Sequence, residues 1–223
     1  MREAYHEQLD EVTAGLVEMS RLAGTAIGRA STALLDADLA LAESVIEADD
    51  AVDALYEEVE SLAFDILALQ APVAGELRAV VAALRISATL ERMADLAEHV
   101  AAVARRRYPA SVVPPEMRSL LLEMGQVAER IVQKAGSVIA SQDVETALEL
   151  EGDDDRMDHL HRKLLKTMLE SSWDNGVETA IDLSQVSRYY ERFADHAVSV
   201  ARRVVFLVTG EKYEDLLAAR TSS

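Results

Sequence analysis

The chain has 223 residues, of which 50% are hydrophobic and only 4% are aromatic, and nine Gly and four Pro interrupt it; this composition is typical of an all-helical protein. Its 40 acidic and 22 basic residues give a formal charge of −18, which argues against nucleic acid and anionic lipid surfaces as partners. The absence of cysteine excludes disulfides and thiolate metal sites. The sequence contains no run of about 18 apolar residues, so no membrane-spanning helix is predicted. Residues 1–7 lack the apolar stretch of a signal peptide, so a cytoplasmic protein without direct membrane insertion is expected.

Three long helices are predicted for the first half of the chain. Apolar residues recur at steps of three and four over residues 5–35, and the small-residue pair Gly24 and Gly28 predicts close packing of this helix against a neighbour. The same spacing continues without interruption over residues 38–69, after an Asp-Ala-Asp break that supplies an N-cap. The third helix is expected to span residues 72–107, with a proline at its start and three arginines in a solvated last turn.

The second half repeats this plan after a proline-rich linker over residues 108–115. Helices are predicted over residues 115–141 and 144–171, and a last helix ends near residue 209. Because such short connections make neighbouring helices antiparallel, the predicted fold is all-α, with two tandem pseudo-symmetric antiparallel three-helix bundles. The expected division is a first bundle at residues 1–108, a second bundle at residues 114–213, and a loose C-terminal tail at residues 214–223.

An internal repeat with an offset of 100 residues supports this plan. Glu91-Arg92-Met93-Ala94-Asp95 matches Glu191-Arg192-Phe193-Ala194-Asp195 position for position. Each copy has an apolar stripe that we expect in the core: Ile86, Leu90, Met93, Ala97 and Val100, and their counterparts Val186, Tyr190, Phe193, Ala197 and Val200. A second stripe runs through Leu77, Val81, Leu84 and Ala88 and continues into Glu91 and Asp95. The third helix is therefore expected to contact a partner on each side.

Pairs of acids four residues apart recur at equivalent places in the two repeats. They are Asp49 and Asp53, Glu91 and Asp95, Asp154 and Asp158, and Glu191 and Asp195. In each repeat the two pairs lie at similar heights on antiparallel neighbours, so four carboxylates can converge. Such oxygen ligands suit Mg, Mn, Ca or iron ions, whose charge would offset the repulsion. His99 and His161, about one turn from these acids, are further candidate ligands.

Two alternatives to this metal hypothesis concern the same acids and stay open. In the first, four arginines neutralise the acids in ordinary ion-pair networks: Arg85, Arg92, Arg188 and Arg192. In the second, the chain is a carboxylate-bridged metalloenzyme or a metal store, but a di-iron bundle needs two Glu-x-x-His motifs and only Glu3-Ala4-Tyr5-His6 fits. The sequence shows no Gly-rich phosphate loop and no Ser/His/Asp arrangement, so conventional catalysis is not expected.

The repeated motif, together with its context, resembles the PhoU family. Leu84-Arg85-Ile86-Ser87 leads into the first copy of the motif, and Gln70-Ala71-Pro72-Val73-Ala74-Gly75-Glu76-Leu77-Arg78 resembles the family's entry to the third helix. The resemblance covers residues 3–213. It implies two three-helix bundles whose repeated acidic motifs can bind multinuclear metal clusters, here through the eight acids named above.

The resemblance also implies a function that composition and spacing do not show. It implies a cytosolic, non-enzymatic regulator of phosphate uptake, which docks on the ATPase subunit of the phosphate ABC transporter and on a PhoR-type sensor histidine kinase. Such a protein is a negative regulator, because it holds the phosphate-starvation response off when phosphate is plentiful. A homodimer, peripheral to the inner face of the membrane through its partners, is expected.

Overall fold

The computed structural model describes residues 2–221, and all regular structure in this range is helical. The helices are α1 (Arg2–Asp36), α2 (Leu39–Ala48), α3 (Asp50–Gln70), α4 (Gly75–Arg107), the short 3-10 helix η1 (Pro115–Met117), α5 (Arg118–Ser141), α6 (Val144–Met168), α7 (Gly176–Thr209) and α8 (Tyr213–Thr221). None of the described helices is long and apolar enough to cross a membrane. The prediction of an all-α fold is confirmed.

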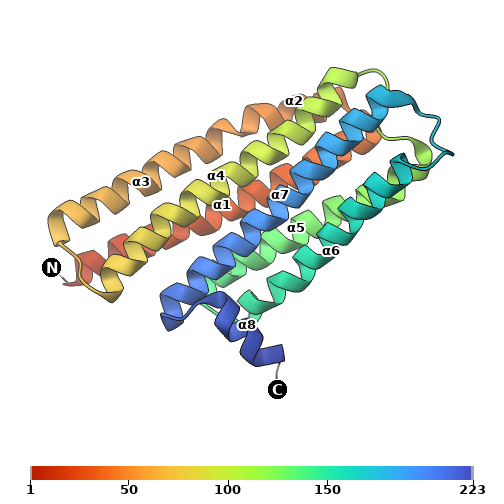
Figure 1. Ribbon diagram of the computed structural model, residues 1–223. Helices are drawn as coiled ribbons and strands as arrows, with labels where there is room; N and C mark the ends of the chain where they lie inside the picture. The colour runs from red at the N-terminus through yellow and green to blue at the C-terminus, as the bar shows by residue number, and fades with distance from the viewer. Residues whose placement is uncertain (1, 222–223) are drawn as a thin grey trace.

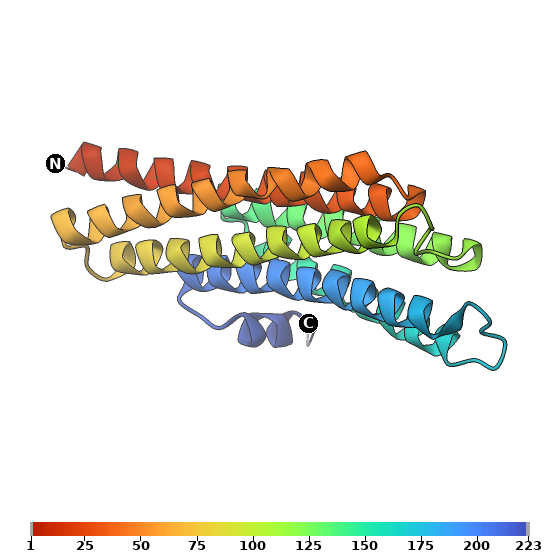
Figure 2. The ribbon, with the colours of Figure 1, turned by 90° about the horizontal axis from the view of Figure 1, so that it is seen from above.

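Two three-helix bundles make up the molecule, as the repeat predicts. The first consists of α1, the α2–α3 pair and α4, and the second of α5, α6 and α7. Helices α3, α4, α7 and α6 follow one another across the view of Figure 1, and Figure 2 shows the same helices along the length of the molecule. The bundles meet where α1 packs against α5 and α4 packs against α7.

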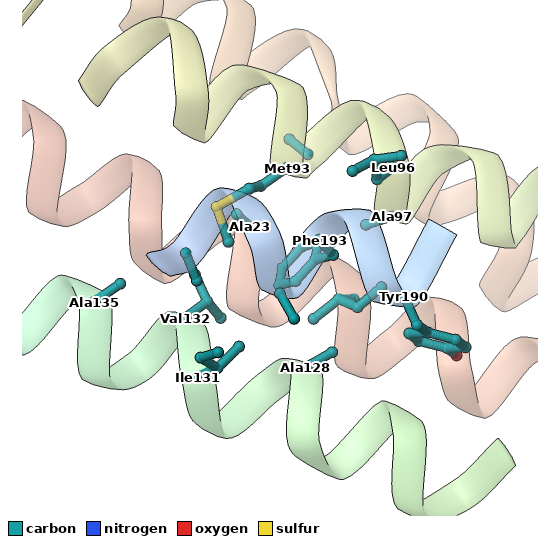
Figure 3. Close-up of a cluster of buried hydrophobic side chains, with 14 of the residues drawn as sticks. Ala23, Met93, Leu96, Ala97, Ala128, Ile131, Val132, Ala135, Tyr190 and Phe193 are labelled. Atoms are coloured by element: carbon teal, nitrogen blue, oxygen red, sulfur yellow. The ribbon is translucent and has the colours of Figure 1, made fainter. Parts of the chain in front are cut away.

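The core lies between these four central helices and belongs to both bundles. Both predicted core stripes are buried, and in Figure 3 Met93 of α4 and Phe193 of α7 lie close to Val132 of α5. The prediction that Gly24 allows close packing also holds, because a Cβ there would lie 3.2 Å from Val132. The two halves share one hydrophobic cluster. The boundaries 1–108 and 114–213 therefore stay a prediction of where the two repeats lie, and they do not describe two domains with separate cores.

A buried polar contact also links the two bundles. The hydroxyl of Tyr190, on α7, lies 2.7 Å from the hydroxyl of Ser31, on α1, and Ser31 in turn donates to the carbonyl of Ile27. Gly125 of α5 lines this contact, because a Cβ at that position would lie 2.7 Å from Ser31 Oγ. The tyrosine is fully buried, so this hydrogen bond satisfies a hydroxyl that water does not reach.

Two helix boundaries differ markedly from the prediction, and α6 also ends at Met168 rather than near residue 171. The second predicted helix is interrupted at Asp49, whose carbonyl accepts hydrogen bonds from the N–H groups of both Val52 and Asp53, at 2.8 and 3.2 Å. Asp49 keeps helical dihedral angles (φ −64°, ψ −37°) and its side chain makes no capping hydrogen bond, so the interruption is a local irregularity of the backbone hydrogen bonds. Pro72 lies in the connection rather than in α4, because Ala71 and Ala74 both have positive φ angles, of 46° and 50°.

The C-terminal segment is more ordered than the predicted loose tail. Residues 213–221 form α8, and the buried Tyr213 donates a hydrogen bond from its hydroxyl to the carbonyl of Ala147 on α6, at 3.2 Å. The guanidinium of Arg202 lies over the Tyr213 ring, 5.5 Å from its centroid. Leu216 and Leu217 also pack against the core, so residues 214–221 form an ordered helix in place of the loose tail expected there.

Candidate functional site: two clusters of carboxylates

The N-terminal carboxylate cluster consists of Asp49, Asp53, Glu91 and Asp95. It forms where the α2–α3 junction faces the middle of α4, as the antiparallel arrangement predicts. Asp49 is half-buried, and burial raises the pKa of its carboxyl from 3.8 to about 7, with further contributions from the negative charges of Asp53 and Asp95. The structure therefore brings the two predicted pairs of the first repeat into electrostatic contact.

The C-terminal carboxylate cluster consists of Asp154, Asp158, Glu191 and Asp195, on α6 and α7. Burial raises the pKa of Asp154 from 3.8 to about 7, and the negative charges of Asp195 and Asp158 add to this effect. Asp154 thus repeats the behaviour of Asp49. Two carboxyls at equivalent places in the repeats thus have pKa values raised to about 7, well above those of ordinary surface acids.

The surroundings also raise the pKa values of the glutamates in the two clusters. Burial raises the pKa of Glu91, the negative charge of Asp95 raises it further, and Arg92 opposes both effects. Burial likewise raises the pKa of Glu191, whose Oε2 atom is buried without a hydrogen-bond partner. A buried carboxylate oxygen without a donor is costly, so a cation or a proton at this place would stabilise the fold.

The hypothesis that arginines neutralise the clusters holds for some of the acids. Arg92 lies 3.0 Å from Asp95 and 3.6 Å from Glu91, and Arg188 forms an ion pair with Glu191. Arg162, which was not predicted, lies 3.6 Å from Asp158. All three arginines are largely exposed, so each pair contributes little stability.

Within residues 2–221, the ion pairs of Arg85 and Arg192 that this hypothesis also requires are not formed. In the same part of the chain, no ion pair involves Asp49, Asp53, Asp154 or Asp195. Arginine therefore pairs with only two of the four acids in each cluster.

The candidate histidine ligands have other contacts. The ring of His99 packs edge-on against Tyr189 of α7, with ring centroids 5.3 Å apart, and its Nδ1 lies 3.6 Å from Glu98. His161 Nδ1 lies 3.0 Å from the hydroxyl of Ser187, and burial lowers the pKa of its imidazole. The side chains of the Glu3-Ala4-Tyr5-His6 motif lie outside the described residues.

The fit of the clusters to a metal ion is partial. Their donors are hard carboxylate oxygens, and both clusters carry excess negative charge that a divalent ion would offset. As they stand, no three His, Asp or Glu side chains of the described residues are arranged to hold one ion. Chelation would require the carboxylates to rotate toward each other from helices that already place them in electrostatic contact.

Sequence reasoning missed a second group of paired charges, at the C-terminal end of α4. The arginines there were expected in a solvated last turn, but Arg106 Nη2 lies 2.6 Å from the buried Asp182 of α7. Arg107 lies 3.4 Å from the same carboxylate and also pairs with Glu178. The expectation is wrong for Arg107, which is largely buried, whereas Arg106 is 55% exposed; both arginines join the two bundles. The repeat could have suggested it, since antiparallel α4 and α7 bring residues near 106 beside residues near 180.

Comparison with known proteins covers almost the whole chain. A family model for the PhoU domain matches residues 16–104 and 121–204, which correspond to the two bundles. The chain is 50% identical over 210 residues to a phosphate-specific transport system accessory protein PhoU homolog 2 of Mycobacterium tuberculosis, covering 94% of this chain and 99% of that protein. It is 49% identical over 215 residues to a PhoU homolog 1 of Mycobacterium leprae, covering 96% and 97%.

A solved structure supports the same relationship. The crystal structure of PhoU from Pseudomonas aeruginosa superposes with a TM-score of 0.84 at 28% sequence identity, over 93% of this chain and all of that chain. The family match covers both repeats, the relatives span the chain nearly end to end, and the fold agrees. The chain belongs to the PhoU family.

Proposed function

We propose that the protein regulates phosphate uptake as an accessory protein of a phosphate-specific transport system. The observation that carries this proposal is the match of both repeats to the PhoU domain, with relatives at about half sequence identity that bear the accessory-protein name. The two carboxylate clusters fit the proposal, because both repeats contain the acidic motif that resembles the family.

The finer mechanism that we propose is negative regulation by an adaptor. The protein would dock on the ATPase subunit of the phosphate ABC transporter and on a PhoR-type sensor histidine kinase, and would hold the starvation response off when phosphate is plentiful. It would act in the cytoplasm as a homodimer, without catalysis and without inserting into the membrane. The length of the molecule suits an adaptor that contacts two partners. Helix α4 has 33 residues and α7 has 34, so each is about 50 Å long at 1.5 Å per residue.

Deletion of the gene tests this function. Phosphate-starvation genes should be expressed in rich phosphate when the gene is deleted, and the intact gene supplied in trans should restore repression. Repression that survives deletion, in cells without a second gene of the family, would contradict the proposal.

We also propose, as a second function of the same clusters, that they bind divalent or iron ions. The specific support is that each repeat brings two acid pairs into contact on facing helices and leaves each cluster incompletely neutralised by arginine. Bound ions would supply positive charge there. The residues that would hold them are the eight acids of the two clusters, with identity and number of ions left to measurement.

Thermal melts decide between metal binding and simple ion pairing. The wild-type melting temperature should rise when Mg, Mn or Fe(II) replaces EDTA, because binding to the folded state alone stabilises it by about 2.7 kcal/mol at one hundred times the Kd. Asp95→Asn combined with Asp195→Asn should remove most of that rise. Equal wild-type melting temperatures in EDTA and in all three metals would refute metal binding and leave the ion-pair hypothesis.

A further inference from the structure

A groove with four arginines lies between the start of α4 and the end of α7, away from both carboxylate clusters. Its volume is about 550 Å³. The lining includes apolar Leu77, Val81 and Phe206, and we call it the arginine groove because four arginines lie beside them: Arg78, Arg85, Arg202 and Arg203. The side chains of Leu77 and Val81 belong to the second stripe of α4, which was expected to be covered by a neighbouring helix. Leu77 is instead 42% exposed, so no helix of the described chain covers this part of the stripe.

Three of the four arginines of the groove are not neutralised within the described chain, whereas Arg202 lies 3.8 Å from Glu151 and 3.7 Å from Glu214. In the described part of the chain, no ion pair within 4.0 Å involves Arg78, Arg85 or Arg203. Arg203 is half-buried and donates to the carbonyl and hydroxyl oxygens of Ser199, at 3.0 and 2.5 Å. Burial lowers the pKa of Arg203, and the positive charge of Arg85 lowers it further. A groove with three uncompensated arginines is unexpected in a protein whose formal charge is −18.

The opposite end of the α4–α7 pair provides an internal comparison. There Arg106 and Arg107 of α4 are paired with Glu178 and Asp182 of α7. The residue that corresponds to Glu178 in the first repeat is Arg78, at the 100-residue offset. The same helix junction is therefore neutralised within the chain at one end and left cationic at the other.

The composition of the groove is that of a protein interface. Interface centres are enriched in arginine and aromatic residues and depleted in Lys, Glu and Asp. Among the residues that the structure describes, no Lys, Glu or Asp lines this groove. Phe206 is 46% exposed, and the guanidinium of Arg78 lies over its ring, 5.7 Å from the centroid. A segment that covered this site would bury an apolar side chain and an already ordered guanidinium together.

Charge decides which kind of partner fits. In a symmetric dimer built on this groove, arginines would face arginines, because a two-fold interface places the same patch on both subunits. An anionic membrane surface would be repelled by the −18 charge of the whole chain. A single acidic segment of another protein meets neither obstacle, because it can occupy the groove alone.

We propose that the arginine groove binds an acidic amphipathic helix of a different protein. Two antiparallel helices form a groove into which a third helix can lay its apolar face. Leucine or phenylalanine side chains of the partner would contact Leu77, Val81 and Phe206. Its Asp and Glu side chains would pair with the three unpaired arginines, Arg78, Arg85 and Arg203. The inference deepens the proposed adaptor function, but it does not depend on which protein supplies the helix.

Site-specific crosslinking in the cells that make the protein tests the proposal. Phe206 is replaced with p-benzoylphenylalanine, which keeps an aromatic ring in the groove, and the crosslinked segment is identified by mass spectrometry. We expect a helical segment of another protein with an excess of Asp and Glu. The control is the same replacement at Phe64, which is 55% exposed on α3 and lies outside the groove; it should not capture this segment.

Charge variants test whether the arginines are responsible. Arg85→Glu combined with Arg203→Glu should lower the crosslink yield at least about tenfold, because like charges would then face each other across the interface. Arg21→Glu combined with Arg29→Glu makes the same change in net charge on exposed positions of α1 and should leave the yield unchanged. If the groove variant loses helical structure by circular dichroism, Arg85→Gln combined with Arg203→Gln replaces it, with a smaller expected loss.

Four results would overturn the proposal: a crosslink to a second copy of this chain, a crosslink to lipid, a crosslink that the groove variants do not weaken, or no crosslink at all. An arginine-dependent crosslink to an acidic helix of a protein unrelated to phosphate transport would support the groove and contradict the proposed function. The two proposals can therefore fail separately.

Discussion

Replacement of Asp49 with Asn should stabilise the protein at pH 8. The pKa of Asp49 rises from 3.8 in a solvated chain to about 7 in the fold, so the ionised carboxylate destabilises the folded state. At about 1.36 kcal/mol for each tenfold change, the rise corresponds to about 4 kcal/mol for a fully buried group. Asp49 is only half-buried, and solvent screening reduces the expected gain from Asp49→Asn to about 1–2 kcal/mol.

The pH dependence distinguishes this effect from a general loss of negative charge. Below about pH 4 the carboxyl is protonated in both the folded and unfolded states, so Asp and Asn behave alike. Between about pH 4 and 7 the unfolded state loses the proton first, and wild-type stability falls relative to the variant as the pH rises. Urea unfolding at pH 4, 6 and 8 measures the difference, with Asp65→Asn, an exposed position on α3, as the control. An Asn variant that is no more stable than wild type at pH 8, or a gain that is equal at all three pH values, would refute this reasoning.

Two further predictions concern the contacts between the bundles. Tyr190→Phe should cost about 1 kcal/mol in urea unfolding because Ser31 keeps its backbone hydrogen bond, whereas Ser31→Ala should cost about 1–3 kcal/mol because it leaves the buried tyrosine hydroxyl unpaired; the reverse order would contradict the assigned contact. Arg106→Ala combined with Arg107→Ala should cost about 3 kcal/mol by calorimetry, because Asp182 would remain buried without a counter-charge, and Asp182→Ala should cost less. A double arginine variant as stable as wild type would show that these pairs do not join the bundles.

Periodicity was sufficient to predict the long helices and their core stripes. The apolar residues of α4 and α7 fall on one face at steps of three and four, and burial of that face follows from the spacing alone. The boundaries at Asp49 and Gly75 were not predictable in this way. They depend on the backbone hydrogen bonds of Asp49 and on the positive φ angles of Ala71 and Ala74, which periodicity does not encode.

The candidate site was predictable only as a set of acids in contact. The repeat identified the eight carboxylates, because equivalent places on antiparallel helices must lie at similar heights. The ion-pair partners of these carboxylates were not predictable. Arg85 and Arg92 both lie close to the acids in the sequence, yet Arg92 pairs with Asp95 whereas Arg85 lines the arginine groove. Which of several nearby acids an arginine pairs with depends on how the side chains pack between helices, and a single sequence does not specify that packing.

Binding to the phosphate transporter decides whether the protein is an accessory regulator. The purified chain, mixed with the purified phosphate ABC transporter in nanodiscs, should form a complex that is retained on size-exclusion chromatography and captured by the isolated ATPase subunit. The same chain should not bind an unrelated ABC transporter prepared in the same way. Failure to bind the phosphate transporter at micromolar concentrations, with and without phosphate and divalent ions, would contradict the proposed function.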